Sequence, residues 1–590
     1  MATFRRLLTF LRDYKRGVWL SGVLAAVAMG MTVAIPALTG AAINAIDAHN
    51  SSRLKLLALL IAGAGIVRLG LTVARRLIAG KVSLGVELDL RNALYDHLLS
   101  LELGFFDRQQ TGQLMSRATV DLQAVRFFLG YGLVLISQAA LTIAFAAVAM
   151  VVIDPVLALI ALSPVPFVIW IAARYGRQAR PALQEVQQRI AELTADVEEN
   201  VGGVRVVKAF AREERQLTRF GESVARVFEQ SMISTRLRAF YNPFIGFLPQ
   251  IGLALLLLLG GRAVIDGSLS LGEFTAFYTY LLALLAPVRT LGVLLGMSQR
   301  ATASGARIFE LLDRKPQIVA APGAGPLPSG SGRVELRGAS LTYEDAGEPA
   351  LDDVTLTVEA GTTIALVGAT GSGKTSLVQL VSRLYDATAG EVLVDGADVR
   401  SVDPRALRRE IAVVTDDPFL FSATVHENIA YARRDEATRE QVVEAARRAQ
   451  AHDFIAALPD GYDTRVGERG LTLSGGQRQR IAIARALLAD PRVLILDDAT
   501  SSVGASTEQQ IKRALQEVMA GRTTFVIAHR LSTIALADEI AVLEHGRLLD
   551  HGTHDELLRR SAFYGEIVEK GLPDQVFLTR KALEPEVAGL

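Results

Sequence analysis

The amino-acid sequence predicts two regions of different fold class, an α-helical transmembrane region with six spans followed by a soluble α/β region. Three observations lead to this prediction. Six long apolar stretches fill the first half of the chain, at roughly residues 18–41, 54–79, 128–152, 155–175, 243–264 and 274–297. A segment rich in Pro, Gly and Ser, APGAGPLPSGSG, covers residues 321–332. Beyond it, short runs of β-branched residues alternate with helical patterns, as is typical of an α/β unit.

The composition fits a membrane part joined to a soluble part. Half of the 590 residues are hydrophobic and 21% are charged. The mean hydropathy is +0.30, which is unusual for a purely soluble protein. The formal net charge of zero gives no indication of a nucleic-acid partner, and we expect none. The absence of cysteine excludes disulfides, thiolate metal sites and cysteine nucleophiles.

The apolar stretches and the charges between them predict a topology. Each stretch is long enough to cross a hydrocarbon core of about 30 Å. Arg and Lys are dense before the first span and in the connections 80–127 and 176–240, whereas the other connections are short and carry few positive charges. Residues 3–16 alternate basic and apolar residues at helical spacing, which predicts a helix lying in the interface. The positive-inside rule then predicts that the N-terminus, both long connections and the α/β region lie in the cytoplasm. We therefore expect a multi-pass protein of the cell membrane.

The two long connections are themselves predicted to be helical, because apolar residues recur in them at three-to-four spacing. The helix of the sixth span is expected to continue to about Arg314. We therefore assign residues 1–314 to a transmembrane domain with an N-terminal interfacial helix, 315–333 to a linker, 334–572 to the α/β domain and 573–590 to a C-terminal tail.

A glycine-rich turn carries the strongest chemical signal. GATGSGKT, from Gly368 to Thr375, follows the apolar strand TIALV and precedes the helix SLVQLVSRLY. Its glycines allow backbone N–H groups to surround phosphates at a helix N-terminus, Lys374 neutralises β- and γ-phosphate charge, and the Thr375 hydroxyl ligates Mg²⁺. A chance glycine turn is the alternative, which the flanking strand and helix disfavour. The residues assigned to nucleotide binding are Gly368, Thr370, Gly371, Ser372, Gly373, Lys374, Thr375 and Ser376.

Two further segments complete this chemistry. The apolar strand VLILDD ends at Asp497 and Asp498. A carboxylate at the carboxyl end of such a strand, near the glycine-rich turn, can hold Mg²⁺, and we assign Asp497 to that role. LSGGQ precedes the helix RQRIAIARALL, and a serine with two glycines at a helix start forms a second anion site. The residues assigned to this second site are Ser474, Gly475, Gly476 and Gln477.

With these motifs the chain resembles the ABC transporters, and the resemblance covers nearly the whole chain. Residues 334–572 resemble the ATP-binding cassette, of which LSGGQ is the signature, and the membrane part resembles the six-helix exporter type. FFDRQQTGQLMSR (105–117) and VGGVRVVKAFAREE (201–214) resemble the two cytoplasmic coupling segments, and TRVGERG (464–470) resembles the loop before the signature. The resemblance implies ATP and Mg²⁺ as cofactors. It also implies a second half-transporter, the lipid bilayer and an amphiphilic small-molecule substrate as partners.

Four positions gain a role only through this resemblance. Tyr343 matches the residue that stacks on adenine, and His529 matches the histidine that contacts the γ-phosphate. Asp498 stands where the family has a glutamate that orients or deprotonates water. Asp416 stands where the family has a glutamine, and as a carboxylate it can still ligate Mg²⁺. Asp498, His529 and Asp416 are therefore the candidate catalytic residues.

The departures from the family pattern predict slow hydrolysis at this site. Aspartate is one methylene shorter than glutamate, and a displacement of about 1 Å in a positioned group can cost on the order of 10²-fold in rate. Gly504, in SSVGAS, lacks a further family carboxylate, whereas LSGGQ is intact. In the family's head-to-tail arrangement each signature serves the other chain's ATP. We therefore interpret the chain as the degenerate-site subunit of a heterodimer.

Several alternatives stay open. A symmetric homodimer, an ATP-binding regulatory subunit and an importer built on the exporter fold are each compatible with the motifs. Two intramembrane charges, Arg68 and Arg289, are candidate substrate contacts, with snorkelling or an interhelical hydrogen bond as the other interpretation.

Overall fold

A computed structural model describes residues 2–433, 436–467, 470, 472–497, 505–528 and 530–570, with the backbone alone described for a few residues inside helices. The chain divides into two compact units. The helical unit comprises Met1–Leu99 and Thr111–Arg314, and the cassette unit comprises Ser100–Gln110 and Lys315–Leu590. Ser100–Gln110 therefore belongs with the α/β part of the chain although it lies inside the sequence of the helical part.

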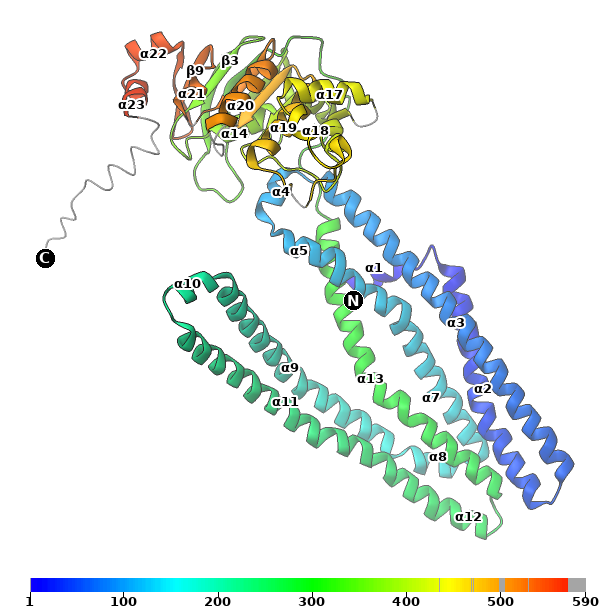
Figure 1. Cartoon of the computed structure of the whole chain (residues 1–590). Helices are drawn as coiled ribbons and strands as arrows, with labels where there is room; N and C mark the ends of the chain where they lie inside the picture. Colours follow the sequence, from blue (N-terminus) through cyan, green and yellow to red (C-terminus); the bar gives the residue numbers. More distant parts are fainter. Residues whose placement is uncertain are drawn as a thin grey trace. The chain divides into compact units, whose positions relative to one another are not determined.

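Long helices build the helical unit (Figure 1). In chain order they are α1 (Ala2–Thr9), α2 (Lys15–Asp47), α3 (Ser51–Ser100), α5 (Thr111–Ser116), η1 (Arg117–Asp121), α6 (Leu122–Phe127), η2 (Phe128–Gly132), α7 (Leu133–Ile153), α8 (Pro155–Leu162), α9 (Pro164–Gly202), α10 (Val204–Ala209), α11 (Glu213–Leu255), η3 (Leu256–Gly260), α12 (Gly261–Ile265) and α13 (Leu271–Leu312). The turns η1, η2 and η3 are π-helical.

Among the described residues, five helical runs are long and apolar enough to cross a membrane: Lys15–Asp47, Ser51–Ser100, Thr111–Ile153, Pro155–Gly202 and Glu213–Ile265. Each of them contains one of the predicted spans. The stretch 274–297 lies in α13, where the side chains of several residues are not described, so the sixth span stays a prediction. The expected helical continuations are confirmed, because α3 runs on to Ser100 and α9 to Gly202.

The interfacial helix predicted over residues 3–16 is shorter than expected. Helix α1 ends at Thr9 and α2 begins at Lys15. The guanidinium of Arg6 donates to both carboxylate oxygens of Asp313 at 2.5 and 2.6 Å. Its Cζ also lies 4.1 Å from the ring centroid of Phe309. These contacts hold α1 against the end of α13, and the chain turns between α1 and α2 instead of continuing as one helix.

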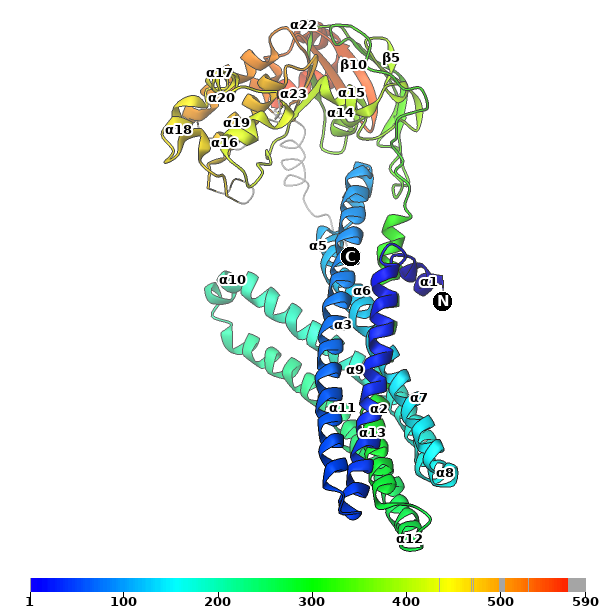
Figure 2. The same cartoon turned by 90° about the vertical axis from the view of Figure 1, so that its right-hand side faces the viewer.

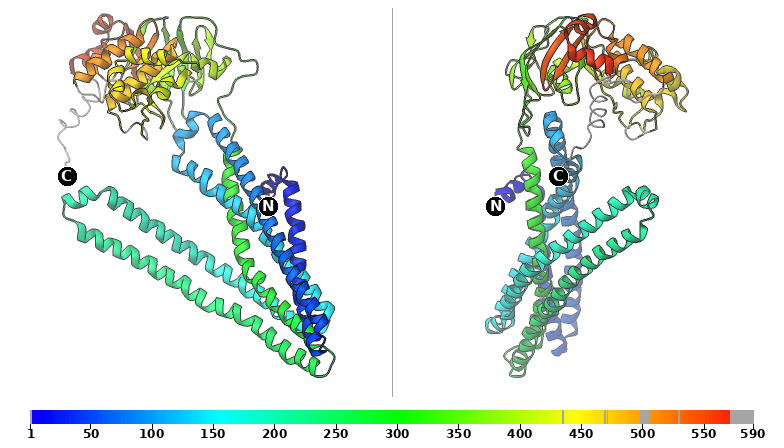
Figure 3. Two further views of the ribbon diagram at one scale, coloured as in Figure 1. Left: turned by 45° about the vertical axis from the view of Figure 1, so that its right-hand side comes forward. Right: turned by 90° about the vertical axis from the view of Figure 1, so that its left-hand side faces the viewer.

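Helices α9 and α11 form a long hairpin whose tip is α10. Both panels of Figure 3 show the two helices side by side along their length. Figures 1 and 2 show the hairpin diverging from α2, α3, α7 and α13 with increasing distance from the end where α8 and α12 lie. At that end an apolar cluster joins α7, α8 and α13. Helices α2 and α13 approach closely there, and the side-chain oxygen of Asn44 accepts the N–H of Gly272 at 2.7 Å.

The cassette unit contains two sheets. The smaller one is antiparallel, in the order β2–β1–β4–β5. The larger one has the order β10–β9–β3–β8–β7–β6, and its strands are parallel except for β10. The strands are β1 (Val334–Leu341), β2 (Leu351–Val358), β3 (Thr363–Val367), β4 (Ala389–Val394), β5 (Ala397–Asp398), β6 (Ile411–Val414), β7 (Val493–Asp497), β8 (Thr523–Ile527), β9 (Glu539–Glu544) and β10 (Arg547–Gly552).

Burial on both faces explains the continuous apolar runs of the parallel strands. In β3, Ile364 and Leu366 enter the core between the two sheets, whereas Ala365 and Val367 pack against a second cluster. The helices are α4 (Leu103–Arg108), α14 (Lys374–Val381), η4 (Val399–Ser401), α15 (Pro404–Arg409), α16 (Val425–Ile429), η5 (Ala430–Arg433), α17 (Arg439–Arg448), α18 (His452–Ala456), η6 (Gly461–Asp463), α19 (Gly475–Ala489), α20 (Ala505–Met519), α21 (Leu531–Ile534), α22 (His554–Arg560) and α23 (Ala562–Lys570).

Candidate functional site

The glycine-rich turn joins β3 directly to α14, and its geometry requires glycine. A Cβ atom at Gly368 would lie 2.1 Å from the carbonyl oxygen of Leu543. At Gly373, where φ is +99°, a Cβ atom would lie 2.6 Å from the carbonyl oxygen of Ala350. Backbone atoms cannot move aside as a flexible side chain can, so any larger residue would distort the turn. The turn lies at the N-terminus of α14, a position favourable for an anion, and one of its N–H groups, that of Ser372, donates to the carbonyl oxygen of Ala369 at 3.1 Å.

Two buried side chains of the turn fit a phosphate ligand. Lys374 is buried, and its ammonium donates to the carbonyl oxygens of Gly368 at 2.8 Å and Ala369 at 2.9 Å. Ser372 is also buried, and within the described part of the chain its Oγ has no hydrogen-bond partner. Buried hydroxyls are normally paired. An unpaired hydroxyl beside a buried ammonium is therefore suited to an acceptor oxygen such as that of a phosphate.

The predicted magnesium ligands lie along one edge of the large sheet. Ile527 of β8 pairs with both Leu366 of β3 and Asp497 of β7. Leu496 pairs with Val414 at the end of β6. Leu366, Ile527 and Asp497 therefore lie in one row, two residues before Gly368, and Val414 lies in the adjacent row, two residues before Asp416. This edge is where ligands bind in open α/β sheets.

The donor set at this edge fits Mg²⁺, which phosphate and water also ligate, better than it fits a metal ion whose ligands all come from the protein. Among the described residues no group of three or more His, Asp or Glu could hold a metal ion. Mg²⁺ is usually bound through one or two carboxylates together with phosphate oxygens and water. Thr375, Asp497 and Asp416 supply a hydroxyl and two carboxylates, which is sufficient for that mode. Thr375 and Asp416 are exposed, so both can be reached by a ligand.

Tyr343, the predicted adenine platform, follows the end of β1. Its hydroxyl bonds to Ser376 Oγ at 2.8 Å and donates to Gln379 Oε1 at 3.1 Å, both on α14. Its ring meets the ring of Tyr385 edge to face, with centroids 5.1 Å apart and an interplanar angle of 87°. The hydroxyl of Ser376, assigned to nucleotide binding from the sequence, thus contacts this tyrosine.

The signature segment forms a helix cap that sequence reasoning missed. Ser474 is the N-cap of α19. Its Oγ accepts the N–H of Gln477 at 3.3 Å, and Gln477 Oε1 accepts the N–H of Ser474 at 2.9 Å. The pattern S-x-x-Q before a helix predicts this capping box. One turn further, Arg478 donates to a carboxylate oxygen of Asp417 at 3.2 Å, which connects the signature helix to the loop that holds Asp416.

Segment 100–110 contacts the cassette next to Tyr343. The hydroxyl of Tyr385 donates to Asp107 Oδ2 at 2.6 Å, and Arg108 forms an ion pair with Glu344. Burial and the hydrogen bond to Asp107 both raise the pKa of Tyr385. Gly104 lies so close that a Cβ atom there would be 2.9 Å from the Tyr385 ring. Residues 105–117 were identified from the sequence as a coupling segment, but nothing in the sequence singled out Tyr385.

Some predicted residues lie outside the described part of the chain. These are Asp498, His529 and Gly504, together with the side chain of Arg289. Their roles stay predictions. Arg68 is described and is exposed on α3.

Two family descriptions match this chain. The ABC transporter transmembrane region matches residues 18–288, and the description ABC transporter matches residues 351–501. The second match contains the glycine-rich turn, Asp416 and the signature segment.

Individual relatives match over nearly the whole chain. The ATP-dependent lipid A-core flippase of Syntrophus aciditrophicus is 38% identical over 96% of this chain and 94% of its own length. The multidrug efflux ATP-binding/permease protein Rv0194 of Mycobacterium tuberculosis is 39% identical over 99% of this chain but only 49% of its own length. A solved bacterial Atm1-family ABC exporter with ATP bound is 28% identical, with a TM-score of 0.79 over 94% of this chain and 98% of that one.

Proposed function

Because this chain belongs to the ABC transporter family, as a half-transporter of the exporter type, we propose that it uses ATP to export amphiphilic or hydrophobic molecules across the cell membrane. The observation that carries the proposal is that one chain contains both helices able to cross a membrane and a cassette with a phosphate-binding turn. Relatives named as a lipid flippase and a multidrug efflux protein favour lipids or drugs as substrates. We place the cassette on the cytoplasmic side of the membrane, where ATP is available.

We assign the steps of ATP use to residues of this chain as follows. Tyr343 stacks on the adenine, and Lys374 with the N–H groups of the turn neutralises the phosphates. Thr375, Asp497 and Asp416 hold Mg²⁺, which supplies charge neutralisation when bound. Asp498 and His529 act on the attacking water and the γ-phosphate. Asp107 and Tyr385 then connect movements around the nucleotide to segment 100–110, which follows α3 in the chain.

We further propose that the chain is the degenerate-site half of a heterodimer. The shorter carboxylate at Asp498, the extra negative charge at Asp416 and the loss of a carboxylate at Gly504 weaken this chain's own site. The intact LSGGQ segment serves the ATP of the partner. A homodimer in which Asp498 functions adequately is the alternative. A regulatory subunit is less favoured, because both coupling segments and the signature are intact, and an importer built on the exporter fold is a further alternative.

Transport is tested in inside-out vesicles that contain this chain together with its candidate partner. ATP-dependent uptake of a fluorescent amphiphilic dye and of a fluorescent phospholipid is measured. We expect uptake of at least one of them, and K374A is the matched control that removes the phosphate contact. Equal signals from wild type and K374A would refute ATP-driven export by this chain.

The heterodimer is tested by the ATPase rate of the purified chain alone. We expect slow hydrolysis that rises on the order of 10²-fold in the double variant D498E/D416Q, because both substitutions restore the family residues. The single variant D416Q is the control for the contribution of the second position. Rapid hydrolysis by the wild-type chain alone would favour the homodimer.

A further inference from the structure

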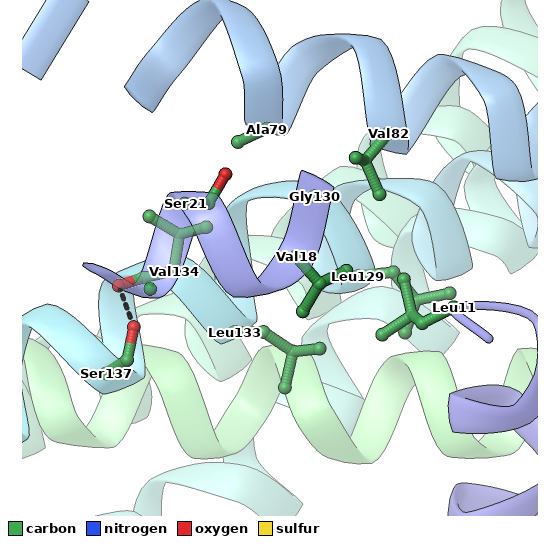
Figure 4. A pocket seen from close by; sticks show the side chains of 11 residues that line it. Leu11, Val18, Ser21, Ala79, Val82, Leu129, Gly130, Leu133, Val134 and Ser137 are labelled. Carbon is green, nitrogen blue, oxygen red and sulfur yellow. Dashed lines mark hydrogen bonds between the residues drawn. The ribbon is translucent and has the colours of Figure 1, made fainter. Parts of the chain in front are cut away.

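A cavity of about 220 Å³ lies in the helical unit between α2, α3 and the start of α7 (Figure 4). Apolar side chains form most of its wall: Leu11, Val18, Val82, Leu129, Leu133 and Val134. Apolar cavities of about 150 Å³ are known to bind benzene. This cavity is therefore large enough for a small organic molecule.

The wall of the cavity is neutral, because none of the described residues that line it is acidic or basic. A buried arginine of α3, Arg75, is not among them. Arg75 is 4% exposed and donates to Gln138 Oε1 at 3.1 Å. A charged group in an apolar site without a partner is costly. The cavity is therefore suited to a neutral molecule.

Ser21 adds one polar group to this wall. Ser21 and Ser137 both line the cavity, but the Oγ of Ser137 already donates to the carbonyl oxygen of Val134 at 2.9 Å. Ser21 is 7% exposed, its Oγ has no hydrogen-bond partner among the described residues, and Figure 4 shows it beside Ala79. A hydroxyl this deeply buried normally has a partner, and its hydrogen can rotate towards an acceptor. Ser21 therefore offers one donor to a ligand.

The π-helical turn η2 fixes one side of the cavity. Leu129 and Gly130, which belong to this turn, are buried and line the cavity. A Cβ atom at Gly130 would lie 2.2 Å from Ser83 Oγ, so the turn packs closely on α3. Turns of this kind occur frequently at functional sites. The wall is thus formed before any ligand arrives, as is usual for small-molecule sites.

Other lining residues are exposed. Val18 is 40% exposed, and Gly22 and Ser137 are exposed as well. All three belong to the stretches that we predict to be the first and third spans, 18–41 and 128–152. We therefore expect a ligand to enter from the membrane, where neutral apolar molecules accumulate.

We propose that this cavity binds a small neutral molecule with an apolar body and one hydrogen-bond acceptor, such as an aromatic alcohol. The apolar body lies among the wall residues, and the oxygen of the ligand accepts a hydrogen bond from Ser21. Water is less suited, because a buried water molecule needs two to four polar partners. The hydrocarbon chain of a lipid would leave Ser21 unpaired. The site uses no residue assigned to ATP binding, so it does not depend on the proposed function.

The test is photolabelling of the full-length chain in phosphatidylcholine nanodiscs with a benzyl alcohol that carries a diazirine. Labelled residues are located by mass spectrometry. We expect label in residues 129–134 that excess benzyl alcohol displaces in a saturable manner. V18F fills the cavity and should abolish this label. V23F is the matched control, because Val23 is 37% exposed on the same helix and does not line the cavity.

A second variant tests the hydrogen bond and leaves the cavity open. S21A should weaken displacement by benzyl alcohol about two- to tenfold, as expected for the loss of one hydrogen bond between neutral groups. Displacement by toluene, which has no hydroxyl, should be the same in S21A and wild type. Label that benzyl alcohol cannot displace would overturn the proposal and favour a lipid chain in the cavity. Equal labelling of V18F and V23F, or equal effects of S21A on both competitors, would also overturn it.

Discussion

The two coupling segments of this chain differ in what they contact. Segment 100–110 lies against the cassette of its own chain through the Tyr385–Asp107 hydrogen bond and the Arg108–Glu344 ion pair. The tip of the α9–α11 hairpin, residues 201–214, presents Val201, Val206 and Phe210 with 68%, 61% and 72% of their surface exposed. The ion pair at that tip, Lys208 with Glu213 at 2.8 Å, closes within the hairpin itself.

If the chain pairs with a second half-transporter, as we propose, this difference predicts where that partner binds. Contiguous apolar patches on an exposed protein surface often mark interaction sites. Polar contacts join segment 100–110 to its own cassette, whereas the exposed apolar side chains of the hairpin tip would be covered by an apolar surface of another chain. We infer that the tip is the segment that depends on the partner.

The largest expected effect comes from the hairpin tip. F210D replaces an exposed aromatic side chain with a charge, which removes the burial that Phe210 would gain against a partner. We expect dye uptake in vesicles to fall about 10- to 100-fold, because burying one Phe side chain is worth about 1.5–3 kcal/mol. F210L keeps most of the apolar surface and should retain activity. Full uptake by F210D would contradict a partner surface at this tip.

A smaller effect is expected at the segment that docks on its own cassette. Y385F removes the hydroxyl that donates to Asp107 but keeps the ring that contacts Tyr343. We expect substrate-stimulated ATPase activity to fall about tenfold, since a hydrogen bond to a charged group is worth about 1.5–3 kcal/mol. The KM for ATP should stay unchanged.

The chain offers a matched control for this variant. Tyr14 donates to Asp89 at 2.8 Å within the helical unit, so Y14F removes a bond of the same kind elsewhere. Equal losses in Y385F and Y14F would show a general structural effect instead of a role in coupling.

The ion pair beside this hydrogen bond should contribute less. R108E places a carboxylate at position 108 opposite that of Glu344. Adding E344R restores an ion pair with reversed polarity. Because both side chains are partly exposed, we expect a loss of about two- to fivefold in stimulated ATPase activity for R108E. The double variant R108E/E344R should recover most of it. Failure to recover would mean that Arg108 acts through another contact.

Sequence patterns predicted the cassette better than the contacts around it. β3, β7 and β8 are buried on both faces, so their apolar runs identify them without other information. The turn at 368–375 is recognisable because nearby backbone atoms leave no room for a side chain at Gly368 and Gly373. In contrast, Tyr385 and Asp107 are 278 residues apart, and each is an ordinary residue in its own segment. Long-range pairs of this kind leave no local signal.

In the membrane part, length and hydropathy predicted the helices but not their partners. Arg75 belongs to a predicted span, although only Arg68 and Arg289 were predicted as functional intramembrane charges. Its burial depends on Gln138 of α7, which the helical period of α3 cannot show. The end of α1 at Thr9 was also missed, because a tertiary contact, Arg6 with Asp313, determines it.

The smallest expected effect distinguishes the two segments by hydrogen exchange. Burial and the hydrogen bond to Asp107 raise the pKa of Tyr385 above its ordinary value of about 10. The stability that this protonated tyrosine contributes is therefore fully present below about pH 10 and is lost as pH rises above it. Hydrogen exchange of segment 100–110 should be protected equally at pH 7 and pH 9 after correction for the intrinsic rate, and Y385F should reduce the protection equally at both. The hairpin tip, residues 201–214, contains no tyrosine, so its exchange should respond to addition of the partner and not to Y385F. Loss of protection of segment 100–110 between pH 7 and pH 9 would contradict a tyrosine that stays protonated over this range.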